Sequence, residues 1–145
     1  MDSKYDSLRL DNQLCFPLYA AAKEVVKKYR PYLDKLGLTY TQYITLMVLW
    51  ENKKMNVKDL GAELFLDSGT LTPVLKSLEK KGYVRRERDD DDERVLNVSI
   101  TLSGEDLKDK AVSIPKAVAS YIKLDQKEAL ELYRLLYKIL RKIND

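Results

Sequence analysis

The chain has 145 residues, a formal net charge of +3, no histidine and one cysteine, Cys15. Without histidine, the commonest general base and every imidazole-dependent triad are absent, which argues against ordinary hydrolase chemistry. A single cysteine excludes an intrachain disulfide and, without histidine, a Cys/His zinc site, so we expect no metal and no cofactor.

The composition predicts a single, mostly helical globular domain over residues 1–145. Charged residues make up 34% of the chain and apolar residues 45%, with only five glycines and four prolines. The uncharged stretch from Leu38 to Trp50 is too short and too polar to span a membrane, and the first residues lack the layout of a secretory signal. We therefore expect a cytoplasmic protein that does not contact a membrane.

A first amphipathic helix is predicted to begin near Leu14–Phe16 and to end at Arg30-Pro31. Pro17 is tolerated within the first turn, where its missing N–H loses no partner, so the helix either begins there or is kinked. One face repeats apolar residues at a spacing of three to four. This face comprises Leu14, Leu18, Ala22 and Val25, with Cys15, Tyr19, Val26 and Tyr29 beside them.

Three short helices are predicted next, each after a residue whose side chain commonly caps a helix. The tight connection between the last two of them is typical of a helix-turn-helix. The segments are 43–52 after Thr39 or Thr41, 57–65 after Asn56, and 68–81 after Asp67, with Gly82 as the stop.

The period then changes to the alternation of a two-stranded hairpin. Residues 83–88 and 95–101 alternate apolar and polar side chains around the turn Asp89–Asp92. Val84 is expected to face inward with Leu96, Val98 and Ile100, which leaves the arginines of the first strand near the surface. Residues 38–101 therefore read as a winged-helix module.

The remaining segments are predicted to be helices that mediate dimerisation. Ser103 and Asp106 match a capping box for a helix reaching about Ile122, with Pro115 as a break or kink. Asp125 caps the last helix, whose apolar stripe comprises Ala129, Leu132, Tyr133, Leu136, Ile139, Leu140 and Ile143. The segments 8–31 and 103–145 carry more apolar surface than the winged module can cover, which predicts a homodimer.

The helix over 68–81 is the candidate reader of double-stranded DNA. Its outer face offers small residues that permit close approach to a major groove, and the hairpin offers arginines to a minor groove. An ordinary solvated surface helix is the alternative, and the basic hairpin that follows favours DNA. The candidate DNA-binding residues are Ser68, Thr70, Thr72, Pro73, Lys76, Arg86, Asp92 and Arg94.

Four consecutive aspartates, 89–92, oppose this interpretation because they repel phosphate. One resolution is that Asp92 holds Arg94 by a charge-assisted hydrogen bond, while the other aspartates splay into solvent. The other is that the hairpin tip is a solvated acidic turn that stays off the DNA.

Two segments resemble a known family. DLGAELFLDSGTLTPVLKSLEKKGYVRRERDDDDERVLNVSITLSG resembles the MarR family of dimeric winged-helix regulators, including its D-x-R wing element at Asp92 and Arg94. LDNQLCFPLYAAAKEVVKKYRPYLDKLGLTYTQY is similar to the organic-hydroperoxide-sensing, one-cysteine branch, the OhrR-like repressors. The expected fold is mainly α with a small antiparallel hairpin wing: a winged helix-turn-helix with N- and C-terminal dimerisation helices.

The resemblance implies that Cys15 is the oxidised thiol and that Tyr29 and Tyr40 are hydroxyl partners of its thiolate. It implies a repressor that binds an inverted-repeat operator as a homodimer. Release is then expected when an organic hydroperoxide oxidises Cys15 and a mixed disulfide forms with a low-molecular-weight thiol. No residue is expected to be catalytic.

The helix itself constrains where this pocket can form. If residues 15–29 are one helix, the rise of about 1.5 Å per residue separates Cys15 from Tyr29 by roughly 20 Å. The two side chains then cannot touch within one chain. The expected pocket is built across the dimer.

Other interpretations stay open at this point. The protein is alternatively a MarR-like repressor released by a non-covalent small aromatic ligand, with Cys15 an inert packing residue. A one-cysteine thiol peroxidase is disfavoured, because the sequence near Cys15 has no arginine to polarise a peroxide and the chain has no resolving cysteine. A purely structural helical adaptor is disfavoured by the pattern of helix-turn-helix and wing.

Overall fold

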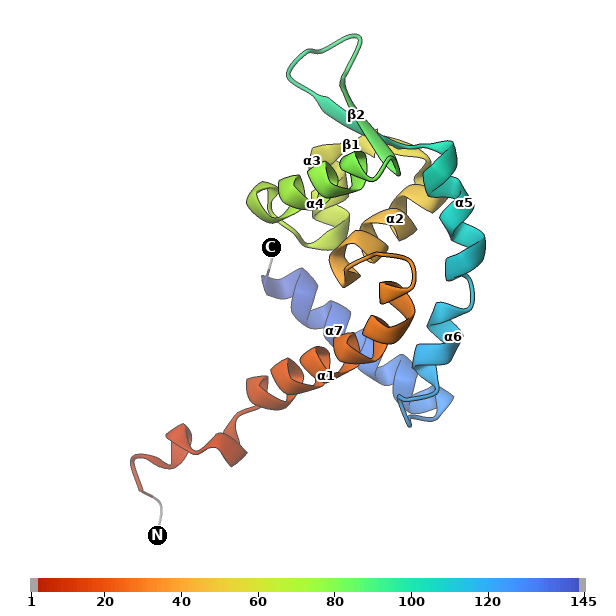
Figure 1. The fold of residues 1–145 in the computed structure, drawn as a ribbon. Coiled ribbons are helices and arrows are strands. Elements are labelled where there is room, and N and C mark those ends of the chain that lie inside the picture. The colour runs from red at the N-terminus through yellow and green to blue at the C-terminus, as the bar shows by residue number, and fades with distance from the viewer. Residues whose placement is uncertain (1–2, 144–145) are drawn as a thin grey trace.

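The computed structural model describes residues 3–143, which form the predicted, mainly helical fold with an antiparallel wing (Figure 1). Two short 3-10 turns precede the first long helix. In chain order the elements are η1 (Asp6–Leu8), η2 (Leu10–Asn12), α1 (Cys15–Asp34), α2 (Tyr40–Asn52), β1 (Lys54–Asn56), α3 (Val57–Leu64), α4 (Ser68–Lys80), β2 (Val84–Arg88), β3 (Leu96–Ile100), α5 (Leu102–Ala111), α6 (Ile114–Ala119) and α7 (Gln126–Ile143).

The hydrophobic core lies in the winged module and the helices packed against it. Every buried apolar side chain of the described residues falls between Leu33 and Val118. Helix α2 runs through the centre, where Leu46 and Leu49 are fully buried. Trp50 ties α2 to α5, because its indole N–H donates to the Gly104 carbonyl at 2.9 Å.

The wing belongs to a three-stranded antiparallel sheet in the order β1-β3-β2. Val84 pairs with Ile100, and Arg86 with Val98, so the buried Val84 and Val98 side chains share the inner face as predicted. Strand β1 was not predicted, because a three-residue strand with one apolar residue, Met55, carries too little alternation to identify it.

The predicted caps of the winged module are confirmed. Thr39 caps α2 in a reciprocal capping box with Gln42, which decides between Thr39 and Thr41. Asn56 accepts from the Asp59 amide, and Asp67 accepts from the Thr70 amide.

Helix α1 begins at Cys15, within the predicted range, but its predicted end is wrong. The helix continues through Pro31 to Asp34. Pro31 removes only one backbone hydrogen bond. The next turn buries Leu33, which is 2% exposed, so core packing offsets that loss.

The predicted cap of α5 is also wrong. Thr101, not Ser103, caps the helix by accepting from the Gly104 amide at 3.1 Å. The Thr101 hydroxyl also donates to the Gly82 carbonyl at 2.6 Å, so the end of β3 leads directly into α5. The predicted break at Pro115 is confirmed, because α5 ends at Ala111 and a separate α6 begins at Ile114.

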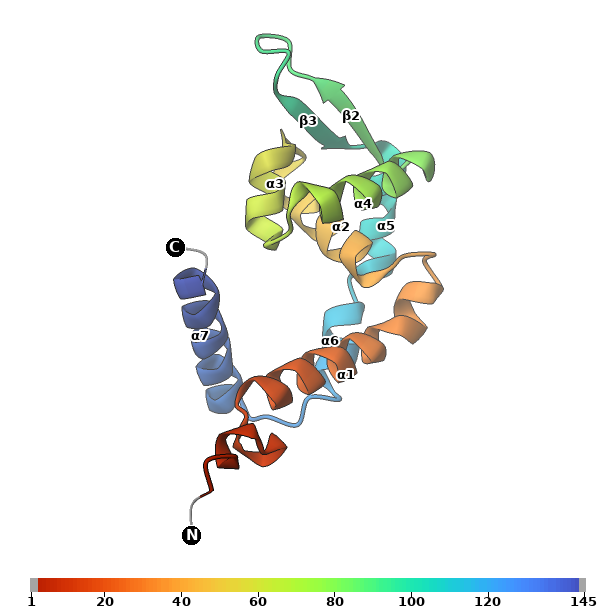
Figure 2. The same ribbon diagram turned by 90° about the vertical axis from the view of Figure 1, so that its left-hand side faces the viewer.

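The two ends of the chain leave large apolar side chains exposed. Figures 1 and 2 show the first turns of α1 projecting from the body and α7 lying to the side of the winged module. None of the described residues of α7 is buried. The exposed apolar side chains of the two helices include Leu14, Phe16, Leu18, Tyr19, Val26, Leu130, Leu132, Tyr133, Leu135, Ile139 and Ile143. Among residues 3–143, no helix is long and apolar enough to cross a membrane.

Candidate functional site

Helix α4, the candidate recognition helix, is held by a tight turn and a buried apolar face. Leu71, Leu75 and Leu78 are at most 1% exposed. The preceding turn needs a glycine at position 61, because a Cβ there would lie 2.8 Å from the Leu66 carbonyl oxygen. The local sequence therefore fixes which side of α4 faces outward.

The outer side of α4 presents the predicted DNA-binding residues. Ser68, Thr70, Pro73 and Lys76 are exposed, and Thr72 is half-buried. Ser68 and Thr72 line a cleft of about 560 Å³ between α3, α4 and residues 94–96 at the loop end of the hairpin, and Arg94 also lines it. The structure thus places residues of the recognition helix and the wing around one hollow.

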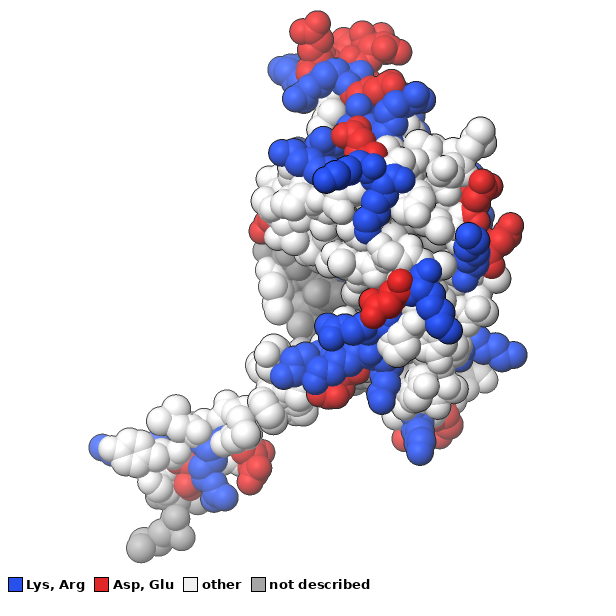
Figure 3. Space-filling view, in the orientation of Figure 1, with Lys and Arg blue, Asp and Glu red and all other residues white. Residues whose placement is uncertain are grey.

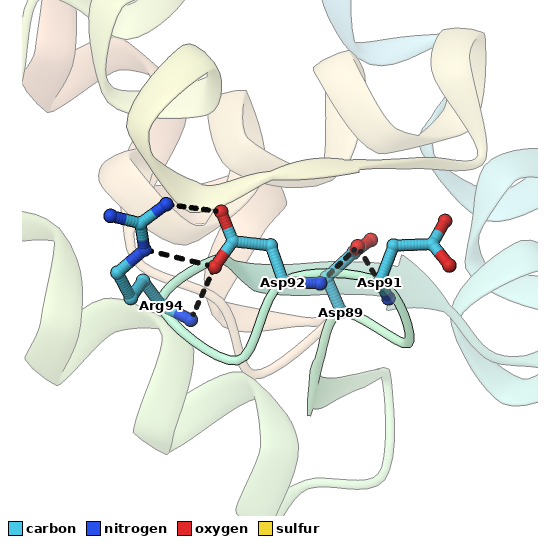
Figure 4. A network of polar contacts seen from close by, with 4 residues as sticks. All are labelled: Asp89, Asp91, Asp92 and Arg94. Carbon is cyan, nitrogen blue, oxygen red and sulfur yellow. Dashed lines mark hydrogen bonds and ion pairs between the residues drawn. The ribbon is translucent and has the colours of Figure 1, made fainter.

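The predicted pair in the wing is confirmed. Arg94 donates from its Nε to Asp92 Oδ1 and from its Nη2 to Asp92 Oδ2, both at 3.1 Å (Figure 4). This bidentate hydrogen bond lowers the pKa of Asp92. The Arg94 side chain is 91% exposed, so its direction is fixed while it remains open to solvent.

Asp89 has a role that the sequence interpretation missed. Its carboxylate accepts from the amides of Asp91 and Asp92 (Figure 4). It also accepts from Asn97 Nδ2 at 2.8 Å. The prediction that all aspartates except Asp92 splay into solvent is therefore wrong for Asp89, which organises the turn. The signal was available, because aspartate at the start of a turn commonly accepts from amides two and three residues on.

Arg86 is tied to the recognition helix. Its amide donates to Glu79 Oε2 at 2.9 Å, and its Nη2 donates to Glu79 Oε1 at 3.0 Å. The Arg86 side chain is only 19% exposed. Its hydrogen bonds, led by that of its amide, lower the pKa of Glu79. This ion pair therefore links β2 to α4.

Basic side chains gather on the same end of the molecule. Figure 3 shows Lys and Arg side chains over the hairpin and the adjoining surface, with acidic side chains concentrated at the hairpin tip. A basic surface next to an outward-facing helix matches the electrostatic footprint of a DNA-binding protein.

A cluster of three tyrosines lies where α1 meets α2. The ring centroids of Tyr29 and Tyr40 are 5.0 Å apart, and Tyr43 lies 5.7 Å from Tyr29. Burial raises the pKa of Tyr29 and Tyr40, and it raises the pKa of Tyr43 to about 12. The structure therefore brings together the two predicted tyrosines and adds Tyr43, which follows Tyr40 by one helical turn.

Cys15 is not part of this cluster within one chain. It is exposed, and it lies 14 residues before Tyr29 on one continuous helix, which separates the two by about 21 Å. The predicted separation is confirmed. The exposure of Cys15 also disagrees with the alternative of an inert thiol packed in the core of its own chain.

An apolar recess adjoins the tyrosine cluster. It has a volume of about 390 Å³ between α2, α5 and α6, and Tyr43 belongs to both features. Its lining comprises Tyr43, Met47, Trp50, Glu51, Lys108, Ala111, Val112 and Pro115. Within residues 3–143, no cluster of three or more Cys, Asp or Glu side chains is placed to hold a metal ion.

Comparisons with known proteins define the family. Residues 24–111 match the family model described as transcriptional regulator SarA/Rot. The chain is 44% identical to the organic hydroperoxide resistance transcriptional regulator of Bacillus subtilis, over 99% of this chain and 98% of that protein. It is 47% identical to the regulator SarZ of Staphylococcus saprophyticus, over 92% of this chain and 91% of that protein.

A solved structure extends the agreement to the fold. The structure of reduced AbfR of Staphylococcus epidermidis bound to DNA superposes on this chain with a TM-score of 0.78. The two sequences are 34% identical, and the match covers 99% of this chain and 100% of that one. AbfR has also been solved in a disulfide form. The chain therefore belongs to the MarR family of winged-helix transcriptional regulators, in its one-cysteine, organic-hydroperoxide-sensing branch, and is a regulator rather than an enzyme.

Proposed function

We propose that two copies of this chain form a repressor that binds an inverted-repeat operator and is released when Cys15 is oxidised. One observation carries the proposal. Tyr29 and Tyr40 form a half-buried phenol cluster, whereas Cys15 stands exposed about 21 Å away on the same helix. Because Cys15 cannot reach these phenols within one chain, we assign the thiol at this cluster to a second copy.

The apolar surface at the two ends of the chain supports the dimer. Both α1 and α7 expose rows of large apolar side chains, for example Tyr19 at 63% and Tyr133 at 62%. Exposed apolar rows of this extent mark protein interfaces. A two-fold dimer through α1 and α7 buries them and carries Cys15 of one copy toward the tyrosines of the other.

The tyrosine cluster suits a partner thiolate. The ordinary pKa of tyrosine is about 10, and burial raises the pKa of Tyr29 and Tyr40 further, so both phenols are protonated at neutral pH. A protonated phenol donates a hydrogen bond to an anion, and the thiolate is the reactive form of cysteine. The apolar recess beside the cluster offers about 390 Å³ for the organic part of a hydroperoxide.

The chemistry then has two steps. The Cys15 thiolate attacks the outer oxygen of the hydroperoxide, an S–O bond forms as the O–O bond breaks, and protonation gives a sulfenic acid and an alcohol. Sulfur loses two electrons and the peroxide gains them. A low-molecular-weight thiol then displaces water from the sulfenic acid to form a mixed disulfide, since the chain has no second cysteine.

DNA binding is proposed for the outer side of α4 and for the wing. Ser68, Thr70, Thr72, Pro73 and Lys76 face the major groove, and Arg94, held by Asp92, enters a minor groove. Arg86 contributes by fixing the wing against Glu79. The two half-sites of one duplex tolerate little change in the spacing of the recognition helices, so enlargement of the thiol pocket releases the dimer.

The replacement Cys15→Ser tests the proposal directly. Operator binding of the variant should match that of the wild type, and release by an organic hydroperoxide with added thiol should disappear. Gel shift and intact-mass measurement of Cys15 on the same sample check both. Release of the variant equal to that of the wild type would refute the redox role.

A second candidate signal is favoured by the recess itself. A small aromatic ligand that enters between Tyr43, Met47 and Trp50 is an alternative trigger that leaves Cys15 reduced. Dose-dependent operator release by a phenolic compound in excess reductant supports this alternative. Release that requires an oxidant supports the thiol.

A further inference from the structure

We infer that Gln42 is a positioning residue that couples the tyrosine cluster to the recognition helix α4. The coupling acts through a polar cluster, the α1–α2–α4 clasp, which is formed by Gly37, Gln42, Ser77 and Lys81. This inference rests on the proposed function for its biological meaning. The mechanical link itself rests on hydrogen bonds within one chain.

The amide of Gln42 joins two helices that are far apart in sequence. Its Oε1 accepts from the Thr39 amide at 3.0 Å, within the cap of α2. Its Nε2 donates to Ser77 Oγ at 2.8 Å, near the end of α4. One planar side-chain amide therefore bonds the first turn of α2 and the recognition helix at the same time.

Lys81 completes the clasp from the end of α4. Its ammonium group donates to Gln42 Oε1 at 3.1 Å and also to the carbonyl oxygen of Gly37. Gly37 forms the turn after α1 with a φ of 68°, a conformation that favours glycine. Lys81 thus ties α4 to both sides of the connection between α1 and α2.

Gln42 is the buried centre of the clasp, whereas Gly37 and Lys81 are exposed. Gln42 is 6% exposed, and both polar atoms of its amide are occupied. Removing it leaves the Thr39 amide and the Ser77 hydroxyl without that partner in a partly buried site, which is costly. The first turn of α2 therefore cannot shift on its own unless several hydrogen bonds break.

The clasp holds the turn of α2 that carries Tyr40, one of the two proposed partners of the thiolate. Tyr40 is the first residue of α2 and lies between Thr39 and Gln42, with its ring 5.0 Å from Tyr29. A displacement of Tyr40 moves the capping turn, and Gln42 passes this movement to Ser77. Without the clasp, these side-chain hydrogen bonds no longer carry the movement to α4.

Two replacements break the clasp at opposite ends, and one provides a matched control. Gln42→Met keeps the volume and removes the amide, whereas Ser77→Ala removes only the acceptor on α4. Thr45→Val is the control, because the Thr45 hydroxyl is equally buried on α2 but donates only to the Thr41 carbonyl of the same helix, at 2.7 Å.

The first measurement is the ratio of operator dissociation constants between oxidised and reduced protein. We expect Gln42→Met and Ser77→Ala to reduce this ratio about five- to ten-fold, because the first loses both partly buried hydrogen bonds that join Gln42 to Ser77 and Lys81 and the second loses the one to Ser77. The rate of Cys15 oxidation, followed by intact mass, should stay unchanged. Thr45→Val should keep the wild-type ratio, which separates coupling from a general loss of stability.

The second measurement does not depend on oxidation. Tyr40→Leu should increase amide hydrogen exchange at Ser77–Lys81 in the wild-type background and leave it unchanged in the Gln42→Met background. If Tyr40→Leu never alters exchange in α4, or if both clasp variants keep the wild-type ratio, the inference is overturned. If exchange responds as expected while oxidation fails to release the wild type, the link stands and the proposed function fails.

Discussion

The winged module and the two ends of the chain differ in how much of their structure a single copy can complete. Between Leu33 and Val118 the chain buries a continuous core, and the predicted caps of α2, α3 and α4 are confirmed. Outside this range, none of the described side chains is buried. One part of the molecule therefore folds against itself, and the other presents surfaces that need a partner.

The difference separates the two tasks of the protein. The residues proposed to read DNA lie on α4 and on the wing, which ion pairs within one chain hold in place. The residues proposed for sensing are separated within one chain, with Cys15 exposed near the start of α1 and the tyrosines clustered where α1 meets α2. The proposed sensing of oxidation therefore requires the dimer.

The largest predicted effect comes from placing charge on the apolar face of α7. The double replacement Leu132→Asp and Ile139→Asp should yield a monomer, because two carboxylates per copy would be buried in the interface. Operator affinity should fall about 1,000-fold, since a monomer reaches one half-site. Sedimentation and fluorescence anisotropy measure both. Gln126→Asp, at the polar start of α7, is the control and should remain a dimer.

A cavity in the winged module should lower the stability of the fold and leave dimerisation unchanged. Leu46 is fully buried, so Leu46→Ala should lower the free energy of unfolding by about 3 kcal/mol. Chemical denaturation measures the loss, and sedimentation should show an unchanged monomer–dimer equilibrium. A dimer that dissociates in the Leu46→Ala variant would contradict the separation of the two regions.

Two arginines of the wing should differ in their effect on DNA binding, because Arg94 is proposed to contact DNA and Arg86 to position the wing. Arg94→Ala should weaken operator binding about five-fold and reduce the slope of log affinity against log salt by about one, because a phosphate or groove contact is lost. Arg86→Met should weaken binding by a similar or smaller factor with an unchanged slope, because Arg86 is bonded to Glu79. Equal slope changes in both variants would show that Arg86 also touches DNA.

The smallest predicted effect concerns Asp89. Its bonds, chiefly that from Asn97, lower its pKa. The stability that they contribute is therefore present above the ordinary pKa of about 3.9 and is lost as pH falls through the lowered value. Asn97→Ala should raise the pKa of Asp89, as followed by carboxyl NMR. An unchanged titration would show that the Asn97 bond does not hold the carboxylate.

Most of the winged module could be predicted from local patterns, because capping residues and alternation act over a few residues. Thr39, Asn56 and Asp67 cap their helices as expected, and β2 and β3 pair as expected. The errors in helix ends and caps lie where tertiary contacts override the local signal. Buried Leu33 keeps α1 helical beyond Pro31, and Thr101 caps α5 because its hydroxyl also bonds Gly82.

In the candidate sites too, contacts between residues close in sequence could be predicted, and contacts between different elements could not. The pairing of Asp92 with Arg94 followed from their spacing, and the separation of Cys15 from Tyr29 followed from helix geometry. The bonds of Arg86 to Glu79 and of Gln42 to Ser77 join residues on different elements, so no local pattern reveals them. Such contacts depend on how the helices and strands are packed.

A mixed dimer tests the shared pocket most directly. One copy carries Cys15→Ser with both tyrosines intact, and the other keeps Cys15 but carries Tyr29→Phe and Tyr40→Phe. If each pocket joins two copies, the only cysteine in this dimer faces intact tyrosines and should be oxidised by an organic hydroperoxide at the wild-type rate. Oxidation as slow as in the homodimer carrying both phenylalanines would contradict a pocket built across two copies.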